Sequence, residues 1–139
     1  MELPLIVVDA ANTVGSVPDG WWRDRHGATE RLRDALVALA ADGLPEHADV
    51  PAWAAGTPLD VLLVVEGAAR GVRPVPGVRV EAAVGSGDDL IVELLARAAR
   101  ERLGRPMLLI TADRQLRARA AMYGALCAGP RAVRRHRRA

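Results

Sequence analysis

The sequence contains no lysine and no phenylalanine, and it has only one tyrosine and one cysteine. Because Cys127 has no second thiol to pair with, an internal disulfide is excluded, which fits the reducing cytoplasm, where we expect the protein. The start of the chain lacks the basic segment of a signal peptide, and no apolar run reaches the roughly 18 residues of a membrane span. We therefore expect no membrane partner. The sequence neither indicates nor excludes a homodimer.

The abundant residues are those of a globular domain. The chain has 139 residues, of which 50% are hydrophobic and 26% charged, enough for one aliphatic core. All 19 cations are arginine, which indicates a coding bias, and a net charge of +2 by itself predicts no polyanionic partner. Arginines gather near the C-terminus, where they fit either attraction to nucleic-acid phosphates or an unfolded tail. We therefore divide the chain into a domain over 1–129 and an arginine-rich tail over 130–139.

Hydrophobic patterning predicts alternating strands and helices. Continuous apolar runs, typical of strands buried on both faces, are followed by segments with helical spacing or by crossovers rich in proline and glycine. Between the first strand and the first helix we expect a long ordered loop. The order predicts an α/β fold with three layers, α/β/α, around a five-stranded parallel sheet. The expected strands are 3–9, 59–66, 78–84, 106–111 and 124–128, the loop is 10–26, and the helices are 28–41, 88 to about 98, and 113–123.

Acidic residues stand where the predicted strands end. Asp9 and Glu66 close the first two strands, Asp113 follows the fourth, and Asp88 and Asp89 open a helix. Because the carboxyl ends of parallel strands share one edge of the sheet, these side chains are expected to converge. Two carboxylates about 4 Å apart repel by on the order of 4 kcal/mol near a protein surface, and a bound cation relieves that repulsion. With oxygen ligands and no His or Cys cluster, the expected cofactor is Mg²⁺ or Mn²⁺.

A purely structural explanation competes with the metal site for each residue taken singly. Asp88, Asp89 and Asp113 lie at predicted helix starts, where a carboxylate caps free N–H groups and stabilises the helix by about 0.3 to 2 kcal/mol. Ser86 and Asp89 have the spacing of a capping box. Asn12, just past the first strand, either stabilises a tight turn or orients a ligand or a bound water. Capping does not explain why the acids share one edge of the sheet.

Three ordered motifs resemble the NYN family of the PIN-like nuclease superfamily. They are Val-Val-Asp-Ala-Ala-Asn after the first strand, Gly-Ser-Gly-Asp-Asp-Leu-Ile before a helix, and Leu-Leu-Ile-Thr-Ala-Asp-Arg-Gln-Leu after a late strand. The match spans residues 3 to about 128. The resemblance implies the strand order 3-2-1-4-5 and metal-dependent cleavage of RNA. By position it implies the metal ligands Asp9, Asp88, Asp89 and Asp113, with Asn12 as a further catalytic residue.

The end of the second strand departs from the family pattern. Similar sequences often end the second strand in Asp-Gly, whereas this chain has Glu66-Gly67. The longer side chain of Glu66 reaches further, so we expect it to support the ligands rather than to act as one of them.

Aromatic and basic residues near the predicted edge are candidates for contacts with the substrate. Trp21 and Trp22 lie in the loop after the first strand, where they either stack on unpaired bases or anchor the loop against the sheet. We expect at least one of the two rings to serve as an anchor. Arginines in the same loop and beside Asp113 fit phosphate clamps, and they fit a solvated surface equally well. These arginines are Arg23, Arg25, Arg114 and Arg117.

The sequence therefore predicts a metal-dependent ribonuclease, with single-stranded RNA as the favoured partner. One alternative is a catalytically weak RNA-binding module in which the tryptophans and the arginine-rich tail make the contacts. The other is a metal-dependent phosphohydrolase of free nucleotides, although the sequence has no glycine-rich phosphate loop of the Walker type.

Overall fold

Five parallel strands form one sheet in the computed structural model, which describes residues 2–134. Their order is β3-β2-β1-β4-β5, so the predicted α/β fold and the strand order 3-2-1-4-5 are confirmed. β1 is central because β2 pairs with it on one side and β4 on the other. The strands are β1 (Leu5–Asp9), β2 (Asp60–Val65), β3 (Val78–Ala82), β4 (Met107–Ile110) and β5 (Leu126–Ala128).

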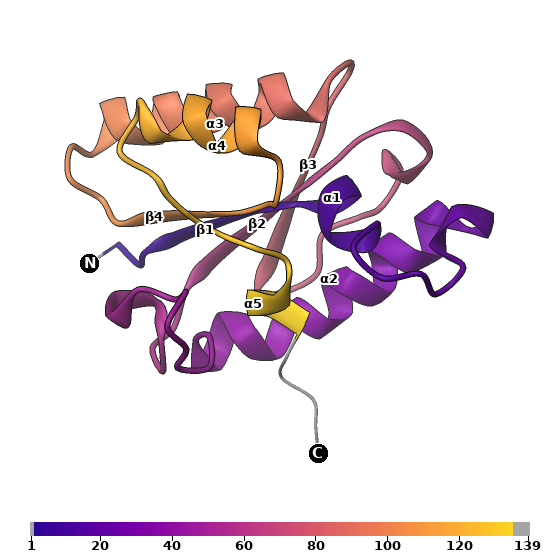
Figure 1. Cartoon of the computed structure of the whole chain (residues 1–139), viewed down its shortest axis with the longest axis horizontal. Coiled ribbons are helices and arrows are strands. Elements are labelled where there is room, and N and C mark those ends of the chain that lie inside the picture. Colours follow the sequence, from indigo (N-terminus) through magenta and orange to yellow (C-terminus); the bar gives the residue numbers. More distant parts are fainter. Residues whose placement is uncertain (1, 135–139) are drawn as a thin grey trace.

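Helices cover both faces of the sheet (Figure 1). α3 (Gly87–Glu101) and α4 (Arg114–Ala121) lie on one face, and α2 (Arg25–Asp42) lies on the other with the short α1 (Ala10–Val14) and α5 (Arg131–Arg134). Three single turns of 3₁₀ helix are η1 (Trp21–Arg23), η2 (Ala52–Ala54) and η3 (Gly67–Ala69). None of the helices in residues 2–134 is both long enough and apolar enough to cross a membrane.

The core has two halves because successive strand residues point to opposite faces of the sheet. In β1, Ile6 and Val8 pack on the α2 side, whereas Leu5 and Val7 pack on the α3 side. All five residues of β1 are buried. β2 and β4 are buried in the same way, and this double burial explains why these three strands appear in the sequence as continuous apolar runs instead of alternating ones.

Two helices lie where the sequence predicted none. α1 falls within the expected loop 10–26, and its five residues are too few to show helical periodicity. α5 falls within the expected tail, with Ala132 and Val133 buried in the core. The packed domain therefore continues past residue 129. The remaining tail arginines, Arg135, Arg137 and Arg138, lie outside the described residues.

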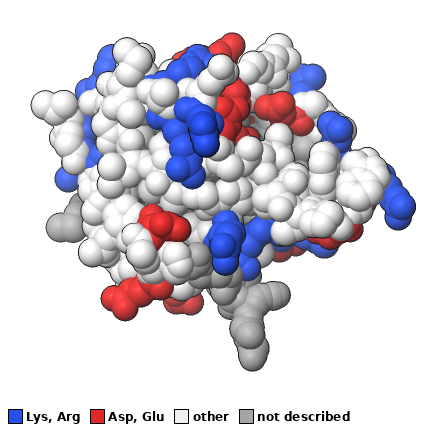
Figure 2. Space-filling view, viewed as in Figure 1, with Lys and Arg blue, Asp and Glu red and all other residues white. Residues whose placement is uncertain are grey.

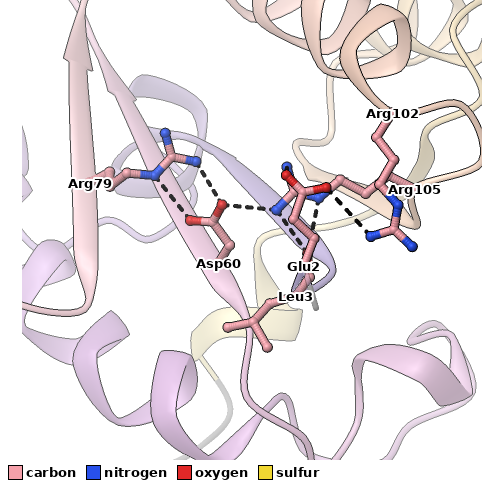
Figure 3. A network of polar contacts seen from close by, with 6 residues as sticks. All are labelled: Glu2, Leu3, Asp60, Arg79, Arg102 and Arg105. Carbon is pink, nitrogen blue, oxygen red and sulfur yellow. Dashed lines mark hydrogen bonds and ion pairs between the residues drawn. The ribbon is translucent and has the colours of Figure 1, made fainter.

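A buried arginine, Arg105, connects the amino ends of the strands (Figure 3). This end of the sheet is opposite the one that carries Asp9 and Glu66. Arg105 Nη2 donates to Leu3 O at 2.8 Å and to Asp60 Oδ2 at 3.0 Å, and only 9% of its side chain is exposed. Arg79 also binds Asp60 through two hydrogen bonds of 3.0 and 2.8 Å. Burial alone would raise the pKa of Asp60, but the hydrogen bonds from both arginines outweigh it and lower that pKa.

We expect Arg105→Met to lower the free energy of unfolding by about 2 kcal/mol, because it leaves Leu3 O and the Asp60 carboxylate short of a partner. Arg102→Met is the matched control: within residues 2–134 the half-exposed Arg102 side chain pairs only with Glu2, so the loss should stay below about 0.5 kcal/mol. Since the pKa of Asp60 is lowered, its stabilisation is present above the unfolded value of about 3.9 and is lost as the pH falls through the folded value. Urea denaturation measures both variants, and equal losses would contradict this role.

Candidate active site

Asp9 ends the central strand and is 6% exposed. Its Oδ1 accepts from the backbone N–H of Asn12 at 3.3 Å, so Asp9 caps the short helix α1. Its Oδ2 accepts from the buried hydroxyl of Thr111 at 2.9 Å. Thr111 follows β4 directly, so two neighbouring segments of the sheet edge fix this carboxylate in one orientation.

The environment of Asp9 disfavours its ionised form. Burial raises the pKa of Asp9, whereas the hydrogen bonds from Thr111 and Asn12 oppose the increase. The negative charges of Asp88 and Glu66 raise the pKa further. A carboxylate at the end of β1 is therefore close enough to interact with one at the start of α3 and one after β2, as the topology predicted.

Asp88 belongs to the same electrostatic group. Burial raises its pKa, and the charges of Asp113, Glu66 and Asp89 raise it further, while Arg119 lowers it. Within residues 2–134 the Asp88 carboxylate makes no hydrogen bond and no ion pair. It therefore keeps its oxygen lone pairs available for a ligand.

Glu66 and Asp113 each use one oxygen to hold a helix start. Glu66 Oε1 accepts from the N–H of Gly87 at 2.9 Å, and this bond ties the end of β2 to the first turn of α3. Asp113 Oδ1 accepts from the N–H groups of Gln115 and Leu116 at 2.9 and 3.1 Å, as the capping interpretation predicted. For both side chains the second oxygen has no hydrogen bond to residues 2–134. Capping and ligand binding are thus compatible in these residues.

Asp89 differs from its neighbour Asp88. Its carboxylate is 72% exposed and pairs with Arg119 of α4 at 2.9 Å. The cap of α3 is Ser86, whose Oγ accepts from the N–H of Asp89 at 3.3 Å. Of the predicted acidic pair, Asp88 is the one that interacts with Asp9, whereas Asp89 carries the ion pair that joins α3 to α4.

Asn12 joins α1 to the segment after β4. Its Oδ1 accepts from the N–H of Ala112 at 2.9 Å, which fixes the orientation of the side-chain amide. The Nδ2 group donates no hydrogen bond to the described part of the chain. Asn12 therefore has a structural role other than the predicted stabilisation of a tight turn, because its side chain binds a segment 100 residues away, and it still offers two donors for a bound water or a phosphate oxygen.

The donor set fits a hard divalent cation. No group of three or more His, Cys, Asp or Glu side chains within residues 2–134 is arranged so as to enclose a metal ion. Mg²⁺ does not require such a group, because it usually keeps several waters and is bound through one or two carboxylates together with substrate phosphates. Asp9 and Asp88 supply two carboxylates whose pKa values are raised first by burial and then by neighbouring negative charges, those of Asp88 and Glu66 on Asp9 and those of Asp113, Glu66 and Asp89 on Asp88. A bound cation would relieve this repulsion.

The two tryptophans occupy different environments. Trp21 is partly buried and packs against the core, whereas Trp22 is 51% exposed. The rings meet edge to face, with centroids 5.9 Å apart. Arg25 lies 5.3 Å from the centroid of Trp21, and Arg23 lies 5.8 Å from that of Trp22. Trp21 thus anchors the loop, and Trp22 with Arg23 presents an aromatic and cationic surface to solvent.

The predicted substrate-binding arginines of α4 also differ in their contacts. Arg117 Nε donates to Thr111 O at 2.8 Å and so supports the segment that carries Asp113. Arg114 is exposed and has no hydrogen bond or ion pair with residues 2–134. On the face shown in Figure 2, acidic and basic side chains are interspersed and form no single basic surface.

Thr111 and Arg119 were not among the site residues predicted from the sequence. Thr111 lies within the Ile-Thr-Ala-Asp motif, but its side chain is uncharged, whereas the candidate ligands were identified by their carboxylates. Its Oγ1 donates to Asp9 and accepts from the N–H of Asp113 at 3.2 Å, so it links two acids of the site. A threonine two residues before a candidate acid was the only available signal.

We expect the Asp9 carboxyl of the metal-free protein to titrate above the ordinary value of about 3.9, and Thr111→Val to raise that pKa further, because the variant removes the hydroxyl that favours the ionised form. Thr111→Ser keeps the hydroxyl and is the control. Carboxyl ¹³C chemical shifts recorded against pH measure this directly. An unchanged Asp9 pKa in Thr111→Val would contradict the role of that hydrogen bond.

Comparisons with known proteins show the fold. No protein-family model matches the chain, and no curated protein matches its sequence. The crystal structure of Rae1 (YacP) from Bacillus subtilis aligns with a TM-score of 0.66 at 15% identity, covering 94% of this chain and 71% of that chain. A mutant of the same protein aligns with a TM-score of 0.65 at 19% identity, covering 97% and 74%. The chain shares its three-layer α/β fold with Rae1.

Proposed function

We propose that this chain is a metal-dependent ribonuclease that hydrolyses phosphodiester bonds of single-stranded RNA. The observation that carries the proposal is the set of mutually repelling carboxylates at one edge of the sheet, with Asp9 buried and Asp88 without a partner in residues 2–134. A domain stabilised by its charges would pair these acids with arginines, as it does at the opposite edge around Asp60. Unpaired carboxylates that repel one another at the carboxyl ends of strands are typical of functional sites.

Asp9 and Asp88 are the residues that would hold the cation, and the charge of Asp113 acts on Asp88. Mg²⁺ or Mn²⁺ bound there supplies a Lewis acid for a phosphate oxygen and a water of lowered pKa as the nucleophile. Thr111 and the N–H of Asn12 hold Asp9 in place through its two oxygens. The Nδ2 donors of Asn12 are free to orient a water or a phosphate oxygen.

RNA is the proposed substrate for two reasons. The three motifs of the sequence resemble the NYN family, for which RNA cleavage is implied. In addition, the exposed Trp22 with Arg23 offers a stacking surface and a cation, the combination that binds unpaired bases and the phosphates beside them.

Cleavage assays with labelled single-stranded RNA and, in parallel, free nucleoside triphosphates test this function. We expect RNA fragments in Mg²⁺ or Mn²⁺, none in EDTA, and no phosphate release from the triphosphates. RNA binding without cleavage in any divalent ion would contradict the proposal in favour of a binding module. Hydrolysis of the triphosphates alone would contradict it in favour of a nucleotide phosphohydrolase.

A further inference from the structure

A cavity of ≈ 130 Å³ opens beside the candidate active site. It lies between α1, η1, α2 and the segment that follows β2. The lining residues that matter here are Ala10, Ala11, Trp21, Arg25, Glu66 and Ala69. Ala10 directly follows Asp9, and the charge of Glu66 acts on both Asp9 and Asp88. A group bound in this cavity therefore lies next to the carboxylates.

The walls suit a flat, uncharged group. The alanines contribute small apolar surfaces, and Trp21 is held in place by its packing against the core. The Arg25 guanidinium lies 5.3 Å from the centroid of the Trp21 ring, so an aromatic and a planar cationic surface meet at the cavity. Such surfaces stack on nucleobases.

Glu66 determines which polar groups the cavity accepts. Its Oε1 is fixed by the N–H of Gly87, and its Oε2 has no hydrogen bond to residues 2–134. A fixed carboxylate accepts N–H donors and repels phosphate, carboxylate and carbonyl oxygens. The fitting occupant is planar and presents N–H groups.

We propose that this cavity binds the base of a nucleotide next to the cleaved phosphate and prefers guanine. Guanine presents two adjacent N–H donors on its Watson–Crick edge, whereas uracil presents one N–H between two carbonyl oxygens that Glu66 repels. The phosphates continue toward the carboxylates and the base enters the cavity. This inference rests on the proposed function, because it takes RNA as the substrate.

Binding in EDTA, where no cleavage is expected, tests the cavity separately from the chemistry. The probes are fluorescein-labelled oligouridylates with and without a single guanosine, measured by fluorescence anisotropy. We expect the guanosine to strengthen binding roughly tenfold, within the range of one stacked base. Equal affinities for the two oligonucleotides would overturn the proposal.

Three variants complete the test. Ala11→Leu fills the cavity from an exposed position of α1 and should abolish the gain from guanosine, whereas Ala41→Leu, at an exposed position near the end of α2, should retain it. Glu66→Gln keeps an acceptor for the Gly87 N–H but removes the charge, so the guanosine to uridine ratio should fall toward one. Melting temperatures show that each variant is folded. A ratio unchanged in Ala11→Leu and Glu66→Gln would overturn the proposal.

The binding preference for guanosine is measured without RNA cleavage, so the two proposals can fail separately. If guanosine-selective binding is found but no divalent ion supports cleavage, the cavity stands and the ribonuclease proposal fails. If cleavage occurs without any preference among bases, the ribonuclease proposal stands and the cavity proposal fails.

Discussion

Asp9→Asn should lower the rate of RNA cleavage at least about 100-fold, because in the proposed mechanism it removes a negative ligand of the cation that would stabilise the developing charge. The variant should remain folded. An asparagine keeps an oxygen for the N–H of Asn12 and places an N–H against Thr111 Oγ1. Single-turnover cleavage at saturating Mn²⁺ measures the effect.

Asp42→Asn is the matched control for that substitution. Asp42 is an exposed residue at the end of α2, away from the carboxyl ends of the strands. The Asp42→Asn variant should therefore cleave RNA as fast as the wild type. Asp9→Asn activity within twofold of the control would contradict a role for Asp9 in the reaction.

Asp88→Asn should combine a similar loss of activity with a gain in stability. The ionised Asp88 side chain has no hydrogen bond or ion pair with residues 2–134 and is repelled by Asp113 and Glu66. Replacing it by a neutral side chain therefore removes electrostatic repulsion from the folded state. We expect a gain on the order of 0.5 kcal/mol, about 2 °C in Tm, at pH 7 without metal. Helix capping does not oppose this gain strongly, because Ser86 supplies the cap of α3.

The pH dependence of that gain has a defined sign. Because the pKa of Asp88 is raised in the folded state, ionisation destabilises the protein as the pH rises through the range between the unfolded and folded values. The gain should therefore be full at neutral pH and absent below the unfolded value of about 3.9. Thermal melts across pH provide the measurement, and a variant less stable than the wild type at pH 7 would show that Asp88 acts as a helix-stabilising charge instead.

The fold was predictable because buried parallel strands leave a strong pattern. β1 and β4 are buried on both faces and appear as unbroken apolar runs, and right-handed crossovers then leave few strand orders. The shared edge of the acids follows from the sheet alone. α1 was not predictable from periodicity, because five residues span little more than one turn and its cap is the aspartate assigned to the site.

Details of the site that depend on packing between helices could not be predicted. Asp88 and Asp89 are neighbours in the sequence with the same chemistry, and they differ because Arg119 of α4 reaches only Asp89 with an ion pair. The approach of α4 to α3 sets that contact. Thr111 was overlooked for another reason, since its role depends on β1 and β4 lying side by side.

The proposed mechanism requires Asp9 and Asp88 to hold a divalent cation. Anomalous diffraction from a crystal soaked in Mn²⁺ tests it most directly. We predict a manganese peak at the carboxyl edge of the sheet, about 2.1 Å from an oxygen of Asp9 or Asp88. The peak should be absent in crystals of the double variant Asp9→Asn, Asp88→Asn. Manganese bound only elsewhere on the wild-type protein would contradict the account.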